Sequence, residues 1–386
     1  MEFNNLKIDF TEEQSMVNAS AKEFCADKSD TKKARELIDS KLGFDTDTWD
    51  EITQLGWTGI NIDDQYGGMN FGISAAIPIV EHMGNTMMSI PYPSHLLASE
   101  LIGRLGDQSQ KSQWLPPLCD GKRGTVAFLD NEDWGSEPQL KLIKKNDHYL
   151  MTGEKLLVSD ALSADIIIVL ATIDTHPVFV IVESHMLKPQ DLHPRTLIDE
   201  TKRAADISLQ NIIIEETQIM HASHEIVRDL KLLGSLLVAA ESVGVISITL
   251  KTIVDYLTTR KQFGKLIGSY QSLKHPTVEI LLEMDSAKSL VYHAASIIES
   301  GALSIDSQIA CHMSKAKASD ALSFAGDRAV QFHGGMGFTY DCDAMLFIRR
   351  AQWANQQFGD PQYHRNQLAK LISVSYTHLR AHETCV

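Results

Sequence analysis

The sequence has 386 residues, of which 44% are hydrophobic, and it carries a formal net charge of −15. A chain of this length is too long for one simple core and predicts two or three domains. Its acidity argues against nucleic acids and anionic lipid surfaces as partners, because like charges repel. A polyanionic ligand would therefore need its own local group of basic side chains.

The cysteines are scattered, and none forms a Cys-x-x-Cys pair: Cys25, Cys119, Cys311, Cys342 and Cys385. This spacing argues against a metal site or a redox motif. Free thiols are typical of a reducing compartment, so we expect a cytoplasmic protein. The first five residues contain neither the basic nor the apolar region of a signal peptide. The most apolar run of the middle region, 166–171, is too short to cross a bilayer, and we expect no membrane insertion.

From residue 10 to residue 118 the pattern is mainly helical. Thr11 and Gln14 have the spacing of a capping box at the start of a helix. Residues 1–120 are therefore predicted to form an N-terminal helical domain. Further helices are expected in three segments, 49–56, 75–82 and 94–105.

Short runs of β-branched residues replace this pattern after Gly121. They are separated by Gly, Asp, Asn, Ser and Pro, which is typical of strands joined by turns. Residues 121–222 are therefore predicted to form a middle β domain, a barrel or a sandwich. The expected strands are 124–129, 148–152, 166–172, 178–182, 207–209 and 212–214.

Long periodic segments follow from residue 223. Four long helices with short connections predict an antiparallel four-helix bundle over residues 223–373. The order of helices, strands and helices places the chain in the α+β class. The expected helices are 225–260, 270–300, 304–334 and 343–373.

The last residues, 374–386, differ in character from the rest. They show neither helical nor strand periodicity, and they resemble an in-frame translation of a sequencing-library adapter. We therefore predict that this tail is non-native and lies outside the fold.

Two segments of the bundle region have the residues to bind a ligand. The first, 259–268, ends a long helix with Arg260, Phe263 and a glycine. A guanidinium offers a planar fork of donors that suits a phosphate, although cations before a glycine are also the ordinary end of a helix. The second, 331–338, has three glycines in four positions, which lets its backbone approach a ligand closely. A plain turn between helices is the alternative for this segment.

In this order and at this spacing, the two segments resemble the acyl-CoA dehydrogenase family. The resemblance covers nearly the whole chain and implies the family's fold. Within the family, the chain also resembles subunits of heteromeric bacterial enzymes of the steroid side-chain type. Three further segments carry it, namely 55–60, 66–68 and 113–118 with Gly121 after it.

The resemblance also implies roles for individual residues. In this family the residues that match Arg260 and Phe263 reach across a subunit interface to the adenosine and diphosphate part of a neighbour's FAD. Gln331, Gly334 and Gly335 match the loop that lies along the same part of the cofactor. The implied cofactor is FAD, and the implied protein is an oligomer.

The segments that hold the flavin ring depart from the family pattern. Where the family has Thr-Glu-Pro-Gly-Ala-Gly-Ser-Asp, residues 130–137 keep only Gly135 and Ser136 and carry four carboxylates. These charges would repel an anionic, reduced flavin. Leu157 stands where the family has a tryptophan against the flavin, whereas Ser159 could still donate a hydrogen bond near flavin N5.

The catalytic base departs from the pattern as well. Phe358 stands where many members have a Glu, and Gly234 stands where another subgroup has its base. Glu241 is the predicted substitute, since some relatives carry a Glu on this helix. Its neighbours one helical turn away are apolar or glycine, which predicts an unpaired carboxylate with a raised pKa. The alternative is a buried Glu paired with a distant helix or a neighbouring subunit. His333 is interpreted as a packing residue or an indirect hydrogen-bond donor, and His275 as a structural residue.

The predicted reaction is α,β-dehydrogenation of an acyl-CoA thioester, in which a carboxylate removes an α-proton and a β-hydride passes to FAD. An electron-transfer flavoprotein is the expected electron acceptor. The residues that would reach a neighbour's FAD match the family, whereas those that would hold the flavin ring within this chain are altered. We therefore expect a heteromer with a homologous subunit (α₂β₂). The alternative is a non-catalytic partner subunit that completes the FAD site of a homologous active subunit. An oxygen-using acyl-CoA oxidase has only the shared fold in its favour.

Overall fold

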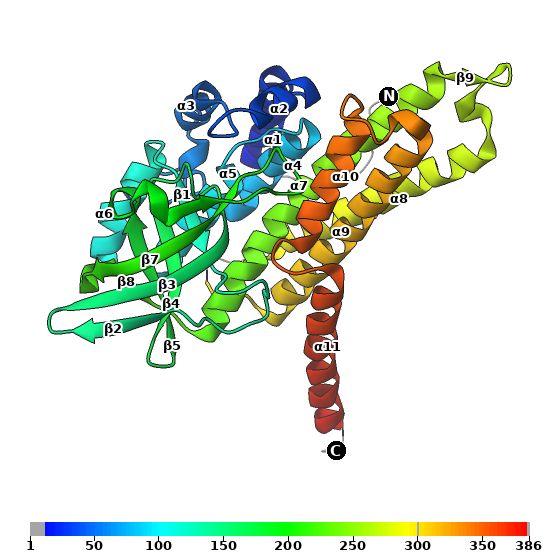
Figure 1. The fold of residues 1–386 in the computed structure, drawn as a ribbon. Helices are drawn as coiled ribbons and strands as arrows, with labels where there is room; N and C mark the ends of the chain where they lie inside the picture. The colour runs from blue at the N-terminus through cyan, green and yellow to red at the C-terminus, as the bar shows by residue number, and fades with distance from the viewer. Residues whose placement is uncertain (1–11, 299–300, 384–386) are drawn as a thin grey trace.

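A computed structural model of the protein describes residues 12–298 and 301–383. The chain passes through a group of helices, then a β-sheet, then a second group of long helices (Figure 1). This order confirms the α+β fold predicted from the sequence.

The N-terminal helices are short, and polar side chains cap several of them. Asp107 shows this at its clearest, because its carboxylate accepts the Gln110 N–H while the Gln110 side chain accepts the Asp107 N–H. The capping box predicted at Thr11 lies outside the described residues. The helices are α1 (Glu12–Lys28), α2 (Thr31–Ile38), α3 (Thr46–Gln54), α4 (Ile77–Asn85), α5 (Tyr92–Leu105) and α6 (Gln108–Cys119).

The β region forms one mixed, eight-stranded sheet with the order β6-β7-β3-β2-β4-β5-β8, in which β1 lies beside β4. A single residue pair, Lys141 with Thr172, joins β2 to β4. Apolar side chains from both sides of this junction share one core, as expected of a layered β domain. The strands are β1 (Gly124–Ala127), β2 (Lys141–Lys145), β3 (His148–Ser159), β4 (Ile166–Ile173), β5 (His176–Glu183), β6 (Leu192–Pro194), β7 (Ala204–Ile214) and β8 (Ile219–His221).

The sheet differs from the prediction at β7 and at three strands that were not predicted, β2, β6 and β8. Residues 207–209 and 212–214, expected as two strands, belong to the single strand β7. The sequence also gave no signal for β2, because this strand is rich in lysine and mostly exposed. A mostly exposed strand of this kind lacks the β-branched run that marks a buried one.

Within its described residues the C-terminal region contains five α-helices rather than the predicted four. The segment 343–373 is broken at Phe358 and Gly359, which have positive φ angles of 57° and 102°. Pro361 begins the next helix, and the Asp360 carboxylate accepts the Tyr363 N–H as its cap. The helices are α7 (His224–Thr259), α8 (Gln271–Ile297), α9 (Ile305–His333), α10 (Asp343–Gln356) and α11 (Pro361–Glu383). Helix α11 thus extends into the segment 374–386, although the predicted origin of that segment stays a prediction.

Helix α7 is the centre of the bundle. Among the described residues it is the one helix long and apolar enough to cross a membrane, but 89% of its most apolar stretch is buried inside the protein. This burial is expected of a core helix. Gly84 of α4 and Gly244 of α7 let these two helices approach closely, because a Cβ at either position would lie within 2.1 Å of a backbone oxygen of the other helix. The crossing fixes the part of α7 that carries Glu241.

Candidate functional site

A cavity lies where the sheet meets the bundle, and we call it the junction pocket. Its lining includes Thr125, Ser159, Leu237, Glu241 and Phe358, from β1, β3, α7 and the turn after α10. The pocket holds about 750 Å³ of empty space, including its mouth. A mainly apolar cavity of this size with a few polar groups suits a small-molecule ligand.

The two alternative positions for a catalytic base meet in this pocket. A Cβ built on Gly234 would lie 2.4 Å from the Phe358 ring, so the ring occupies the space of a side chain at position 234. Neither position carries a carboxylate. The pocket therefore has an aromatic ring where a base would act.

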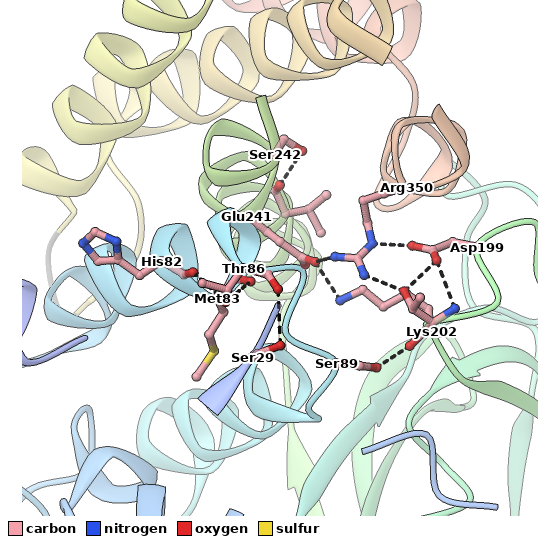
Figure 2. Close-up of polar contacts among 12 residues, drawn as sticks. Ser29, His82, Met83, Thr86, Ser89, Asp199, Lys202, Glu241, Ser242 and Arg350 are labelled. Carbon is pink, nitrogen blue, oxygen red and sulfur yellow. Dashed lines mark hydrogen bonds and ion pairs between the residues drawn. The ribbon is translucent and has the colours of Figure 1, made fainter. Parts of the chain in front are cut away.

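Glu241 lies in the junction pocket but is not free. Its carboxylate pairs with Arg350 of α10 and with the ammonium of Lys202, which is 2.8 Å away (Figure 2). Arg350 also pairs with Asp199 and donates to the Thr201 hydroxyl at 2.6 Å. We call these four charged side chains, Asp199, Lys202, Glu241 and Arg350, the buried ion network.

The raised pKa predicted for Glu241 is wrong. Burial alone would raise the pKa, but the positive charges of Lys202 and Arg350 outweigh it and hold the Glu241 pKa below its usual value. The error arose because helical spacing shows only partners within one turn, whereas both cations come from distant segments. The alternative, pairing with another helix, is the observed one; the catalytic role of Glu241 stays a prediction.

Arg350 was the signal in the sequence that could have revealed this pairing. It is fully buried, and the side chains one helical turn away on α10 are the buried Phe347 and Ala354. A buried guanidinium on an apolar face requires carboxylates nearby, because an unpaired charge in the interior is strongly unfavourable.

The sequence analysis also missed Asp160. Its carboxyl lines the junction pocket beside Ser159 and accepts a hydrogen bond from the Ser94 hydroxyl at 2.6 Å. Burial raises the pKa of Asp160, and the Glu241 charge adds to the shift. Asp160, rather than Glu241, is the pocket carboxyl whose pKa is raised.

A second candidate site lies at the far end of α7, and we call it the donor groove. It is open to solvent and lined by two segments remote in sequence, with Arg260 and Phe263 on one side and Gly334 and Gly335 on the other. The structure thus brings together both segments that the sequence singled out. Gln331 is exposed on the last turn of α9, where its carbonyl accepts the Gly334 N–H.

The exposed groups of the donor groove are typical of a surface that contacts a partner. Phe263 is 91% exposed, at the tip of a two-stranded hairpin made of β9 (Lys261–Gln262) and β10 (Lys265–Leu266). Nothing lies within 4 Å of a Cβ built on Gly334 or Gly335, so their backbone is open to a ligand. An aromatic ring this exposed is unusual on a surface that binds no other molecule.

The two histidines near these segments differ from each other. His333 stacks on Tyr256 with ring centroids 4.2 Å apart, as predicted for a packing residue. His275 is exposed on α8, and its interpretation as a structural residue stays a prediction.

The donor groove and the junction pocket lie far apart. Glu241 and Arg260 are separated by 19 positions along one helix, or about 28 Å at the α-helical rise per residue. Figure 1 shows the β9 hairpin at the end of the bundle opposite to the sheet. The groove therefore faces away from the pocket of its own chain.

Comparisons with known proteins identify the family of this chain. The pattern described as "Acyl-CoA dehydrogenase, N-terminal domain" matches residues 11–122, and "Acyl-CoA dehydrogenase, C-terminal domain" matches residues 233–373. This chain belongs to the acyl-CoA dehydrogenase family. Members of the family are FAD-dependent oxidoreductases, and FAD is the cofactor.

Individual relatives agree with this assignment. The bovine mitochondrial short/branched chain specific acyl-CoA dehydrogenase is 24% identical over 95% of this chain and 87% of its own length. IpdE2, an acyl-CoA dehydrogenase of Mycolicibacterium smegmatis, is 25% identical over 94% of this chain and 98% of its own. The ChsE4-ChsE5 complex of Mycobacterium tuberculosis shares the fold with a TM-score of 0.84 and 19% identity, over 97% of this chain and 99% of the other.

The two ends of FAD fit this acyl-CoA dehydrogenase chain unequally. The donor groove offers a guanidinium and a glycine backbone that no side chain covers, which suit a diphosphate. In the junction pocket, Ser159 is available for the ring, but Leu157 has a φ of 50° and its N–H already donates to Asp206 at 2.9 Å. The residues fit the diphosphate end better than the flavin ring.

The acidic segment 130–137 is less repulsive than the sequence suggested. The ammonium of the fully buried Lys155 lies 2.8 Å from the Asp130 carboxylate and donates to the Phe128 carbonyl. Burial lowers the pKa of Lys155 to about 8, although the Asp130 charge opposes the shift. Arg195 also lies 3.9 Å from the Glu132 carboxylate, so two of the four carboxylates have a cation partner within the chain.

Replacing Arg350 by methionine tests the buried ion network. The change leaves Asp199 buried without its cation, so we expect the free energy of unfolding to fall by about 3–5 kcal/mol. The neighbouring Arg349 pairs with Glu200 in a partly exposed position, and Arg349→Met should cost no more than about 1 kcal/mol. Urea unfolding of both variants measures the difference, and equal losses would contradict this account.

Proposed function

We propose that this chain is the FAD-completing subunit of a heteromeric acyl-CoA dehydrogenase. A homologous subunit binds the flavin ring and the acyl-CoA thioester, and this chain contributes its donor groove to the diphosphate end of the same cofactor. The observation that carries the proposal is the contrast between its two sites. The donor groove is open and has its ligand-binding groups, whereas the junction pocket has Phe358 against Gly234 and a neutralised Glu241.

Each groove residue has a physical role in this assembly. Arg260 provides planar, charged donors for the phosphate oxygens, and the Gly334 and Gly335 backbone can lie against the diphosphate because no side chain intervenes. Phe263 packs at the interface, which removes its apolar ring from water. When bound, FAD accepts the hydride that leaves the acyl β-carbon during α,β-dehydrogenation.

A heterotetramer with two copies of each chain (α₂β₂) satisfies this geometry. In a homotetramer every donor groove would face a neighbour whose flavin-ring site is altered. In a heterotetramer each donor groove of this chain faces a homologous subunit with a complete flavin-ring site. The ChsE4-ChsE5 complex, with its similar fold, is named as an assembly of two different chains. An electron-transfer flavoprotein is the proposed electron acceptor, and the cytoplasm the proposed location.

A second function places the reaction in this chain, with Glu241 as the base. In its favour, Glu241 lines the same cavity as Ser159. Against it, Glu241 is a counter-ion to two cations, which lowers its pKa and weakens it as a proton acceptor.

Substitution of Arg260 by alanine tests the FAD-completing role. Loss of a charged donor to phosphate is worth about 1.5–3 kcal/mol, so FAD retention by the co-purified assembly should weaken by about tenfold or more. Lys261→Ala removes a neighbouring exposed cation from the same hairpin and serves as the control. Flavin absorbance after dialysis gives the readout, and full retention by the Arg260 variant would refute the role.

Glu241→Gln separates the two functions. Removal of a general base lowers kcat by about 10²–10⁴-fold, whereas removal of a counter-ion from a subunit without the base changes kcat little. We expect kcat of the assembly to stay within about threefold of wild type, with some loss of thermal stability. A fall of several hundred-fold, with normal flavin content, would establish Glu241 as the base.

A further inference from the structure

The junction pocket shares one wall with a second cavity, which we call the outer pocket. Arg228, Lys231 and His312 are among the polar side chains of the outer pocket. Trp134 and Phe358 line both cavities, and their ring centroids lie 4.6 Å apart with an angle of 34° between the planes. The two rings therefore separate a mainly apolar cavity from a more polar one.

This wall is packed on two sides. The Phe358 ring fills the notch in α7 at Gly234, where a Cβ would lie 2.4 Å from it. On the other side Phe128 meets Phe358 edge-on at 6.1 Å between centroids, and it meets Trp134 at 6.2 Å. The rings have no space to turn towards α7 or towards the sheet.

Buried polar groups hold the turn that carries Phe358. The ammonium of Lys315, which is fully buried on α9, donates to the Gly359 carbonyl at 3.0 Å. His364 of α11 places Nε2 3.1 Å from the Phe358 carbonyl. Because a carbonyl only accepts, His364 Nε2 carries the proton, and its Nδ1 accepts from His312 Nδ1 at 2.8 Å. Two helices, α9 and α11, thus fix this turn.

The loop that carries Trp134 is fixed as well. Lys231 of α7 donates to the Trp134 carbonyl at 2.8 Å. Within the loop, the Asn131 side chain accepts the Asp133 N–H, and the Asp133 carboxylate accepts the Gly135 N–H, both at 2.8 Å. The wall is therefore a fixed part of the fold on both sides.

The chemistry of the two pockets suits the two ends of one kind of ligand. An acyl thioester has an apolar acyl group and a long polar carrier, so it would need the junction pocket and the outer pocket at once. We propose that Trp134 and Phe358 form an aromatic plug that stops an acyl thioester from spanning the two pockets, so this subunit does not bind substrate. The inference rests on the proposed function, in which the homologous subunit binds it.

The plug is tested by counting bound substrate. The probe is octanoyl-coenzyme A, titrated calorimetrically into the co-purified assembly. The wild-type assembly should bind about one probe per two chains, and Phe358→Ala should raise this number about twofold. Leu237→Ala, which enlarges only the junction pocket, and Tyr363→Ala, which enlarges only the outer pocket, should leave the number unchanged.

Two results would overturn the plug. One is a wild-type assembly that already binds one probe per chain, and the other is a Phe358 variant that keeps its melting temperature but gains no site. Phe358→Leu, which keeps an apolar side chain on the turn, replaces the alanine variant if that one does not fold. Flavin content is read in the same samples, because failure of the proposed function lowers or redistributes FAD independently of the probe count.

Discussion

The structure depends on the buried ion network. Two carboxylates and two cations, from three segments remote in sequence, balance one another beside the junction pocket. Removing Arg350 leaves the Asp199 carboxylate buried without its ion-pair partner, which costs far more than the pair contributes relative to an apolar contact. The network ties α7 and α10 to the segment before β7, and so it sets how the sheet meets the bundle (Figure 2). It also occupies the carboxylate that the chain would otherwise offer as a base.

Because of the buried ion network, the two parts of α7 have different roles. The first half of the helix contributes Glu241 to the network and Gly234 to the packing of Phe358, whereas its C-terminal end leads to Arg260 and an exposed hairpin. The Glu241 charge is paired within the chain, whereas Phe263 on the hairpin is exposed. The proposed role in an assembly rests on this contrast.

The sequence predicted the fold well and the site in part. Periodicity located the long helices, and glycines and capping residues marked most of the turns. The break at Phe358 was missed, because α10 and α11 continue the same periodic pattern on both sides of it, although Gly359 and Pro361 signalled it locally. The donor groove could be predicted, since its residues lie in two compact motifs.

The junction pocket was harder to predict. The partners of Glu241 are Lys202 and Arg350, and the contact between Gly234 and Phe358 joins residues more than 100 positions apart. Pairings of this kind depend on how α7, α10 and the sheet pack together. Helical spacing reports only neighbours within one turn, so it gave Glu241 an apolar environment that the fold does not provide.

The central claim is that this chain completes a flavin site in a homologous neighbour. The most direct test is the flavin stoichiometry of the assembly purified after co-expression with a homologous subunit, together with its mass. The account predicts a heterotetramer with about one FAD per two chains. A stable homotetramer of this chain with one FAD per chain would contradict it, and would mean that Ser159 and the remaining Gly135 and Ser136 suffice to hold the flavin ring.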